Sequence, residues 1–227
     1  MKPLLRSKKT VILLAVLALV LAAGEGFWLS RIYASARDRD IAAKKTEVAA
    51  LIRERAAGII SSEDFAYPLT DAQQALFRNL FSQIQSPEIV RMKIWNEDQV
   101  VLWSNLSEII GQKFPDNDEV KEAYRGDVVL AIEEQKAEHV SERQYASLAE
   151  IYVPLIGPAG KVIGVVEIYE PAVIIDRDAN DEVRRAGVPA VTATVAAYVI
   201  LAAALLRAGK RKRPSPPNGS GASRGAS

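Results

Sequence analysis

The sequence predicts an α+β fold in which one antiparallel sheet of about five strands carries a long N-terminal helix and is flanked by two transmembrane helices. Three observations predict it. Two apolar segments lie near the ends of the chain, a long run of helix-forming residues follows the first of them, and five β-branched segments precede the second. Helices followed by strands favour this class, because regularly alternating strands and helices would instead build a parallel sheet.

The two apolar segments have the length of membrane spans. The first covers residues 11–29 with Glu25 as its one charged residue, and the second covers residues 188–206 without any charge. At about 1.5 Å per residue each helix would measure about 28 Å, close to the ~30 Å hydrocarbon core of a bilayer. We therefore predict two transmembrane helices. A cleaved signal peptide is the alternative for the first, since its charged start, short apolar core and small residues around Ala23 fit that pattern too.

Charge is segregated along the chain and predicts the topology. Residues 1–10 and 207–227 carry lysine and arginine but no acid, so all 28 acidic residues lie between these two basic tails. Because basic residues stay on the cytoplasmic side, we expect both tails to be cytoplasmic and residues 30–187 to form an extracytoplasmic domain. The absence of cysteine favours the inner membrane and periplasm of a bacterium over a eukaryotic cell surface. The C-terminal tail, rich in Pro, Gly and Ser, is expected to be disordered and attracted to anionic lipid.

The exported domain begins with helical patterns. Residues from Ser30 to about Ile60 are strong helix formers, so the first span is expected to continue outward as one long helix. Apolar residues recur there at heptad-like spacing at Ile41, Val48, Leu51 or Ile52, and Ile59. This spacing favours a homodimer formed through the long helix and the spans. The alternative is an amphipathic helix that covers the chain's own sheet, and both can hold on different faces of the helix. Thr70 and Gln73 then form a capping-box pattern that opens a second helix.

Five strands are predicted after these helices, because the pattern changes to period two and to β-branched residues. They occupy residues 88–95, 100–104, 127–136, 146–156 and 161–170. A turn at Asn96-Glu97-Asp98 joins the first two strands, and Gly157-Pro158-Ala159-Gly160 joins the last two as a tight hairpin. A short helix is expected near Asp118 to Tyr124.

Two segments of this region carry the motifs of a known family. In the first hairpin and its continuation, the family's positions are filled by Ile94-Trp95, Val100-Val101, Ser104, Ile110-Gly111 and Gly126. In the closing hairpin they are filled by Pro154, Gly160, Gly164, Val165 and Tyr169. With these motifs, residues 88–171 resemble the extracytoplasmic PAS-like single-Cache sensor domain of bacterial histidine kinases, diguanylate cyclases and chemoreceptors. Glu97-Asp98-Gln99 departs from the family's turn, which contains Asp-Gly.

The resemblance implies a sensor of the kind used in two-component signal transduction. A small molecule, such as an organic anion, would bind outside the membrane, and displacement of the helices would carry the signal across the bilayer. Family members normally continue into HAMP, kinase or cyclase domains, whereas here only the basic tail follows the second span. The output is therefore expected from a separate signalling partner or from an output domain that is missing.

The resemblance also implies a ligand pocket between the sheet and the connection that follows the first hairpin. Cationic, hydrogen-bonding and aromatic side chains of that region are the candidates for holding an anion. These candidates are Arg91, Trp95, Trp103, Tyr124, Arg125, His139, Arg143 and Tyr145. Arg91, Lys93 and Trp95 alternate along one strand and share a face, which is either the pocket wall or the packing site of the long helix.

The sequence does not contain the usual catalytic or metal-binding motifs. His139 is the only histidine, and no HExxH, Walker or Gly-rich phosphate motif occurs, so we expect no enzyme, no catalytic residue, no metal and no cofactor. Residues 176–180 begin like a calcium loop but lack its glycine and closing glutamate, and are interpreted as a helix surface. No aromatic residue accompanies the basic tail, which argues against nucleic-acid binding.

Two other functions fit the same patterns. In one, the exported domain docks another envelope protein and has no small-molecule ligand, which a large exposed apolar patch would favour. In the other, the chain is a fragment of a longer sensor histidine kinase or diguanylate cyclase.

Overall fold

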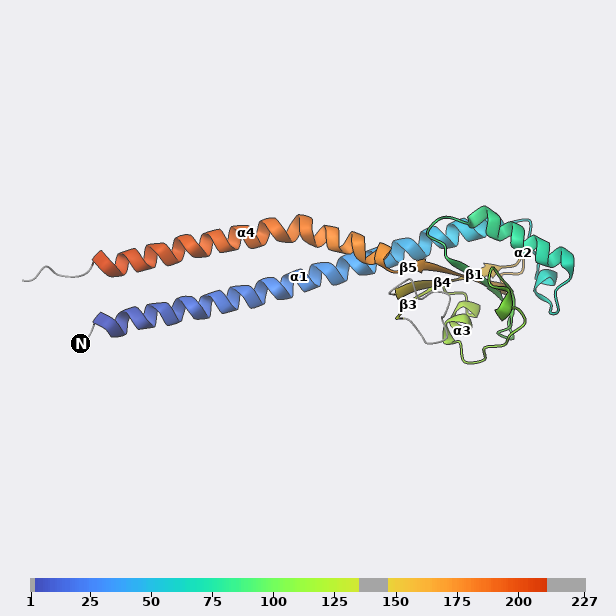
Figure 1. The fold of residues 1–227 in the computed structure, drawn as a ribbon, viewed down its shortest axis with the longest axis horizontal. Coiled ribbons are helices and arrows are strands. Elements are labelled where there is room, and N and C mark those ends of the chain that lie inside the picture. The colour runs from blue at the N-terminus through green and yellow to red at the C-terminus, as the bar shows by residue number, and fades with distance from the viewer. Residues whose placement is uncertain (1–2, 135–146, 212–227) are drawn as a thin grey trace, which may run out of the picture. The chain divides into compact units, whose positions relative to one another are not determined.

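The structure, a computed structural model, describes residues 3–134 and 147–211. Its helices are α1 (Pro3–Ala56), α2 (Asp71–Ile84), α3 (Asp118–Tyr124) and α4 (Val173–Arg211), with short 3-10 helices at Ser62–Phe65 and Ser107–Ile109. Its strands are β1 (Arg91–Trp95), β2 (Val101–Ser104), β3 (Val129–Glu134), β4 (Ser147–Ile156) and β5 (Val162–Pro171). The chain divides into two compact units, one formed by residues 33–182 and the other by the outer parts of α1 and α4 (Figure 1).

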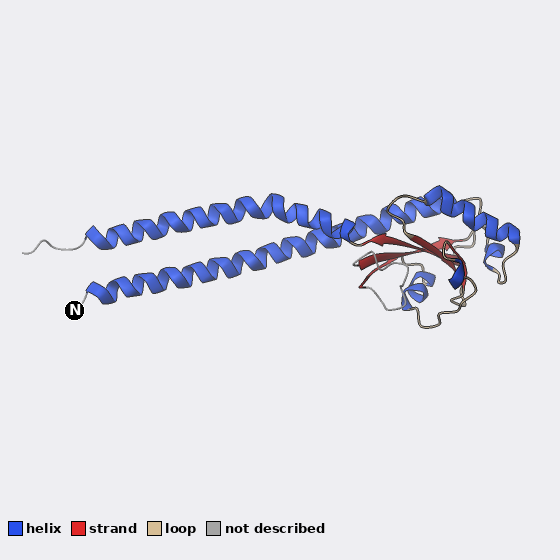
Figure 2. Ribbon diagram, viewed as in Figure 1, coloured by secondary structure: helices blue, strands red, loops and turns tan. Residues whose placement is uncertain are grey.

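The strands form one antiparallel sheet (Figure 2), and their order in it is β2-β1-β5-β4-β3. The first hairpin, β1–β2, joins the last, β4–β5, through the pairing of β1 with β5 at the centre of the sheet. β2 and β3 are the two edges. The predicted α+β fold, with a five-stranded antiparallel sheet and a long N-terminal helix, is thereby confirmed.

α1 and α2 cover one face of the sheet (Figure 1). Val48 and Ile52 of α1 and Phe77 and Leu80 of α2, each at most 3% exposed, pack with strand residues such as Ile168. Burial of a large apolar side chain stabilises the fold by about 1.5–3 kcal/mol. Of the two interpretations of the heptad-like pattern, coverage of the chain's own sheet is therefore confirmed for Val48 and Ile52.

Capping residues explain where the helices on this face begin and end. α1 ends at Ala56, before the expected Ile60, and Gly58 follows in the left-handed conformation (φ +72°) that commonly terminates a helix. Thr70 is the N-cap of α2, as predicted. Its hydroxyl accepts a hydrogen bond from the Gln73 backbone N–H at 3.3 Å, and the Thr70 N–H donates to the Gln73 side chain at 2.8 Å.

α3 covers the opposite face of the sheet (Figure 1). Its residues Val120 and Ala123 are fully buried against Trp95, Tyr152 and Val165. The helix occupies the predicted residues. Its N-cap is supplied by the residue before it, whose side-chain oxygen accepts a hydrogen bond from the Val120 N–H at 2.8 Å.

The second unit consists of the outer parts of α1 and α4, which lie side by side in opposite directions (Figure 1). The Tyr198 hydroxyl donates to the Leu14 carbonyl at 3.0 Å, and Gly187 provides the space that the Leu29 side chain occupies. Both helices are long and apolar enough to cross a membrane. The predicted spans, 11–29 and 188–206, lie within them.

Candidate functional site

The sheet face under α3 carries more charged and hydrogen-bonding side chains than the face under α1, where a single buried pair, Glu170 of β5 with Lys44 of α1 at 2.7 Å, interrupts an otherwise apolar contact among the described residues. Strand alternation places Lys93 and Trp95 on this face, and the register sets Lys93 opposite Glu167 of β5. The Lys93 ammonium lies 3.4 Å from a Glu167 carboxylate oxygen and donates to the Tyr169 hydroxyl. Trp95 Nε1 donates to the other Glu167 oxygen at 2.7 Å. Glu167 is completely buried, so it needs this cation and this donor to offset its lost hydration.

Strand β4 extends this network by one more pair. Glu150 lies opposite Tyr169 and Tyr152 lies opposite Glu167, and the Tyr152 hydroxyl donates to Glu150 at 2.8 Å. The Lys93 ammonium also lies 4.6 Å from the centre of the Tyr169 ring, within the range of a cation–π interaction. We refer to Lys93, Trp95, Glu150, Tyr152, Glu167 and Tyr169 as the polar network.

Burial controls the ionisation of the two tyrosines in the network. Burial raises the pKa of Tyr152 far above its ordinary value, and the carboxylates of Glu167 and Glu150 raise it further. The pKa of Tyr169 is raised by burial first and by Glu167 next. Both phenols are therefore hydrogen-bond donors throughout the physiological pH range.

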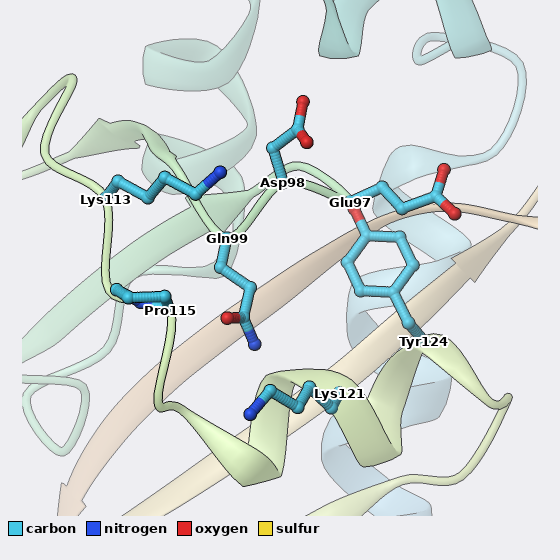
Figure 3. Close-up of a pocket in the computed structure, with 7 residues that line it drawn as sticks. All are labelled: Glu97, Asp98, Gln99, Lys113, Pro115, Lys121 and Tyr124. Atoms are coloured by element: carbon cyan, nitrogen blue, oxygen red, sulfur yellow. The ribbon is translucent and has the colours of Figure 1, made fainter.

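An open pocket of about 420 Å³ lies between the β1–β2 turn and α3 (Figure 3). Its lining combines two lysines, two acids and three other side chains: Glu97, Asp98, Gln99, Lys113, Pro115, Lys121 and Tyr124. Tyr124 connects the pocket to the polar network, because its hydroxyl donates to the Trp95 carbonyl at 3.1 Å. Burial raises the pKa of Tyr124, followed by the effect of the nearby acids Glu97 and Asp98.

Gln99 occupies the middle of this pocket in an unusual backbone conformation (Figure 3). Its φ is +60°, which is uncommon for a residue with a side chain and favours glycine. The Cache family that residues 88–171 resemble has Asp-Gly in this turn, whereas this chain has Asp98-Gln99. Gln99 is buried, with 7% of the residue exposed, and its Nε2 donates to the Asn117 carbonyl at 2.8 Å, which joins the turn to the start of α3.

The pocket has the chemistry to hold a small polar molecule with an anionic group. Lys113 comes from the connection after β2 and Lys121 from α3, so two separate elements supply the positive charges (Figure 3). Lys121 also pairs with Asp118 at 2.9 Å on the exposed side of the helix. Gln99 and Tyr124 are the neutral polar residues of the lining, with the Gln99 Nε2 donating to Asn117 and the Tyr124 hydroxyl to Trp95.

Some of the eight residues that the sequence analysis predicts to bind the ligand lie on the same side of the sheet. Arg91, Trp95 and Tyr124 lie on the α3 side of the sheet, so the face shared by Arg91 and Trp95 is not the packing site of the long helix. Trp103 lies instead in the core under α1 and α2, with its ring 5.6 Å from that of Phe81. Arg125 follows α3 and is exposed. Three of the predicted ligand-binding residues lie outside the described part of the chain: His139, Arg143 and Tyr145.

Sequence reasoning missed most of the polar network and most of the pocket. A signal for the network was available, because Glu150 and Tyr152, and likewise Glu167 and Tyr169, alternate with apolar residues in otherwise buried strands. No comparable signal marks the pocket. Gln99, Lys113 and Lys121 are surface-type residues of separate segments that meet only in the folded chain.

Within residues 3–134 and 147–211, no group of three or more potential metal ligands occurs. Asp176, the first residue of the calcium-like segment, lies in α4, pairs with Arg37 at 3.1 Å and accepts a hydrogen bond from the Tyr33 hydroxyl at 3.2 Å. Asp176 therefore joins α4 to α1 through these two interactions.

Comparison with known proteins found partial structural likeness only. No family model and no curated protein sequence matches the chain. The sensor domain of E. coli DcuS is 18% identical, with 64% of this chain and 98% of that chain covered and a TM-score of 0.44. An extracellular ligand-binding receptor from Desulfohalobium retbaense is 14% identical, with 69% of this chain but 27% of that chain covered and a TM-score of 0.42. The sensory domain of the Campylobacter jejuni chemoreceptor Tlp3 is 12% identical, with 64% and 60% covered and a TM-score of 0.41.

Proposed function

We propose that the chain is a membrane-anchored sensor module that binds a small organic anion outside the bacterial inner membrane and signals through helix displacement. In this proposal residues 11–29 and 188–206 span the membrane, residues 30–187 are periplasmic, and the basic tails at 1–10 and 207–227 are cytoplasmic. The signal passes to a separate partner at the cytoplasmic side.

The pocket between the β1–β2 turn and α3 is the observation that carries the proposal. It combines two lysines from different elements with two acids, Glu97 and Asp98, and with the polar residues Gln99 and Tyr124. The two lysines can bind an anionic group of a small molecule, and the acids and the Gln99 side chain of the same lining can orient its other polar groups. The resemblance of residues 88–171 to a Cache domain supports the same location.

Two helices that are long and apolar enough to cross a membrane support the anchoring. α1 continues from its apolar part to Ile52, which is completely buried in the core, and α4 begins beside the core residues Ala172 and Ile175. A change in the packing of the sheet therefore acts directly on the two helices that would enter the bilayer.

Ion pairs join these two helices at their exit from the periplasmic unit. Arg37 of α1 pairs with Asp176 of α4 at 3.1 Å, and Arg39 pairs with Glu182 at 2.7 Å. All four side chains are at least a third exposed, so each pair contributes little to stability and can rearrange at low cost. A ligand that prefers one of two arrangements of the helices would shift their populations.

Ligand-dependent stabilisation of the full chain in lipid nanodiscs tests the proposal. The panel contains carboxylates, amino acids, purines and divalent ions. A ligand at 100 times its dissociation constant adds about 2.7 kcal/mol to the free energy of unfolding, which corresponds to roughly 5–10 °C in Tm. Failure of every compound to raise Tm would contradict the proposed sensing of a small molecule.

Matched lysine variants test the location of the ligand. Lys113→Met removes a pocket cation, whereas Lys161→Met removes an exposed cation from the β4–β5 turn, outside the pocket. We expect the first to abolish most of the ligand-induced shift and the second to preserve it. Equal shifts in both variants would place the ligand elsewhere.

A further inference from the structure

The groove between α1 and the edge strand β3 is a second surface, which the proposed function does not use. It has a volume of about 470 Å³. Its lining comes from one side of α1 and from the residues that enter β3: Ala42, Lys45, Thr46, Ala49, Ala50, Arg53, Asp127 and Val128. Lys45 and Arg53 lie about two helical turns apart, with the small side chains of Ala49 and Ala50 between them. The groove therefore has a shallow apolar floor and two cations along its length.

β3 begins at Val129, directly after the groove residues Asp127 and Val128. β3 is the last strand of the sheet, and within residues 3–134 and 147–211 no other segment makes backbone hydrogen bonds to its outer edge. Alternate residues of such a strand direct their N–H and C=O groups away from the sheet. On the α1 side, Val128, Leu130 and Ile132 are only half-buried. Among the described residues, a backbone edge without a strand partner and a half-buried apolar strip therefore lie on the same strand.

We propose that this edge binds an extended peptide segment of a partner protein by strand addition, and that the segment carries an acid-x-apolar-x-acid pattern. Strand addition satisfies the open backbone groups of β3 and places every second side chain of the peptide over the groove. Lys45 and Arg53 are about 12 Å apart along the helix, and strand residues four positions apart are about 13 Å apart. Two acids at i and i+4 therefore match the two cations, and the residue at i+2 faces Ala49 and Ala50.

The charge of the groove favours such a peptide over the β3 strand of a second copy of this chain. Two cations and one acid, Asp127, line the groove, so an acidic segment is complementary to it. In β3 itself the acids Glu133 and Glu134 are adjacent in sequence. A β3 strand from a second copy would therefore not supply acids four residues apart.

Binding of a defined peptide to the full chain in nanodiscs tests the proposal. The probe is fluorescently labelled Thr-Glu-Thr-Val-Thr-Glu-Thr, and its anisotropy reports binding. We expect saturable binding of this peptide and at least about tenfold weaker binding of the peptide with lysine in place of both glutamates. Equal affinity for the two peptides would overturn the charge assignment, and absence of binding up to about 1 mM would overturn the proposal.

Matched variants on α1 locate the site. Ala50→Leu fills the groove, whereas Ala43→Leu makes the same change at an exposed position of α1 that does not line it. Lys45→Glu reverses a groove charge, whereas Arg55→Glu reverses an exposed charge of α1 outside the groove. We expect the two groove variants to weaken binding about tenfold and the two controls to leave it within about twofold, with equal Tm values showing that all four are folded. Unchanged binding in Ala50→Leu would contradict the location.

N-methylation of the peptide tests the strand pairing itself. An added strand directs alternate N–H groups towards β3. Methylation of the N–H groups that point towards β3 should therefore abolish binding. Methylation of the alternate N–H groups, which point away from β3, should leave binding unchanged. Equal effects of both sets would overturn strand addition. Concentration-dependent self-association of the chain that Ala50→Leu abolishes would assign the edge to a second copy and overturn the peptide proposal.

Discussion

At the level of single residues, Gln99 combines a backbone conformation that favours glycine with a side chain that the pocket uses. Its φ of +60° is strained for a side-chain-bearing residue, and its amide bonds to the Asn117 carbonyl. Gln99→Ala loses the hydrogen bond and keeps the strain, whereas Gln99→Gly loses the same bond and relieves the strain. We expect Gln99→Ala to be less stable than Gln99→Gly by about 1 kcal/mol in denaturant unfolding. Equal stability of the two variants would show that the turn is not strained.

Tyrosine ionisation gives a second prediction at this scale. Burial raises the pKa of Tyr124, Tyr152 and Tyr169 above the ordinary value of 10.0. Above pH 10 the unfolded chain therefore loses phenolic protons that the folded chain keeps, so stability that is present below pH 10 is lost as pH rises. Each such phenol lowers the free energy of unfolding by about 1.4 kcal/mol per pH unit.

Phenolate absorbance measured during an alkaline titration checks this prediction. At least three of the seven tyrosines should remain un-ionised until the fold is lost, and they should then ionise together with the loss of secondary structure. Smooth ionisation of all seven near pH 10 while the chain is still folded would contradict it.

At the level of elements, one aromatic residue holds the 3-10 helix at 62–65 against the sheet. The Phe65 ring lies over Gly164 of β5, where a Cβ atom would overlap it, and packs with Phe77 of α2 at a ring-centre distance of 5.7 Å. Gly164→Ala should therefore destabilise the fold by about 1–3 kcal/mol through overpacking. In a Phe65→Ala background the same substitution should cost little, because the ring is gone. A double-mutant cycle by thermal or denaturant unfolding measures the coupling, and additive effects would exclude this contact as the cause.

The helices also show how far local patterns predict elements. The capping box of α2 and the bounds of α3 could be predicted because short-range hydrogen bonds determine them, and both are confirmed. The partner of the long helix could not be predicted, since heptad-like apolar spacing serves a second copy and the chain's own sheet equally well. In the structure Val48 and Ile52 are buried against the sheet of the same chain, so the sheet is the partner of the helix at these two positions.

At the level of the whole molecule, the proposed topology can be tested because the chain contains no cysteine. A single introduced cysteine is then the only site for a membrane-impermeant maleimide. Ser82→Cys, at an exposed position of α2, should react in intact spheroplasts. Ser220→Cys, in the basic tail, should react only after the membrane is permeabilised. Labelling of both positions in intact spheroplasts would contradict cytoplasmic placement of the C-terminal tail.

The sequence by itself determined the fold class, the order of the elements and the two apolar helices. These features depend on periodicity, composition and turn chemistry over a few residues, and such signals are readable along the chain. Only the tertiary structure decided which side chains share a site. Trp95 and Trp103 come from paired strands, yet one faces α3 and the other faces α2. Gln99, Lys113 and Lys121 meet because the β1–β2 turn, the connection after β2 and α3 converge on one side of the sheet. Such convergence depends on strand register and packing between distant segments, which no local pattern records.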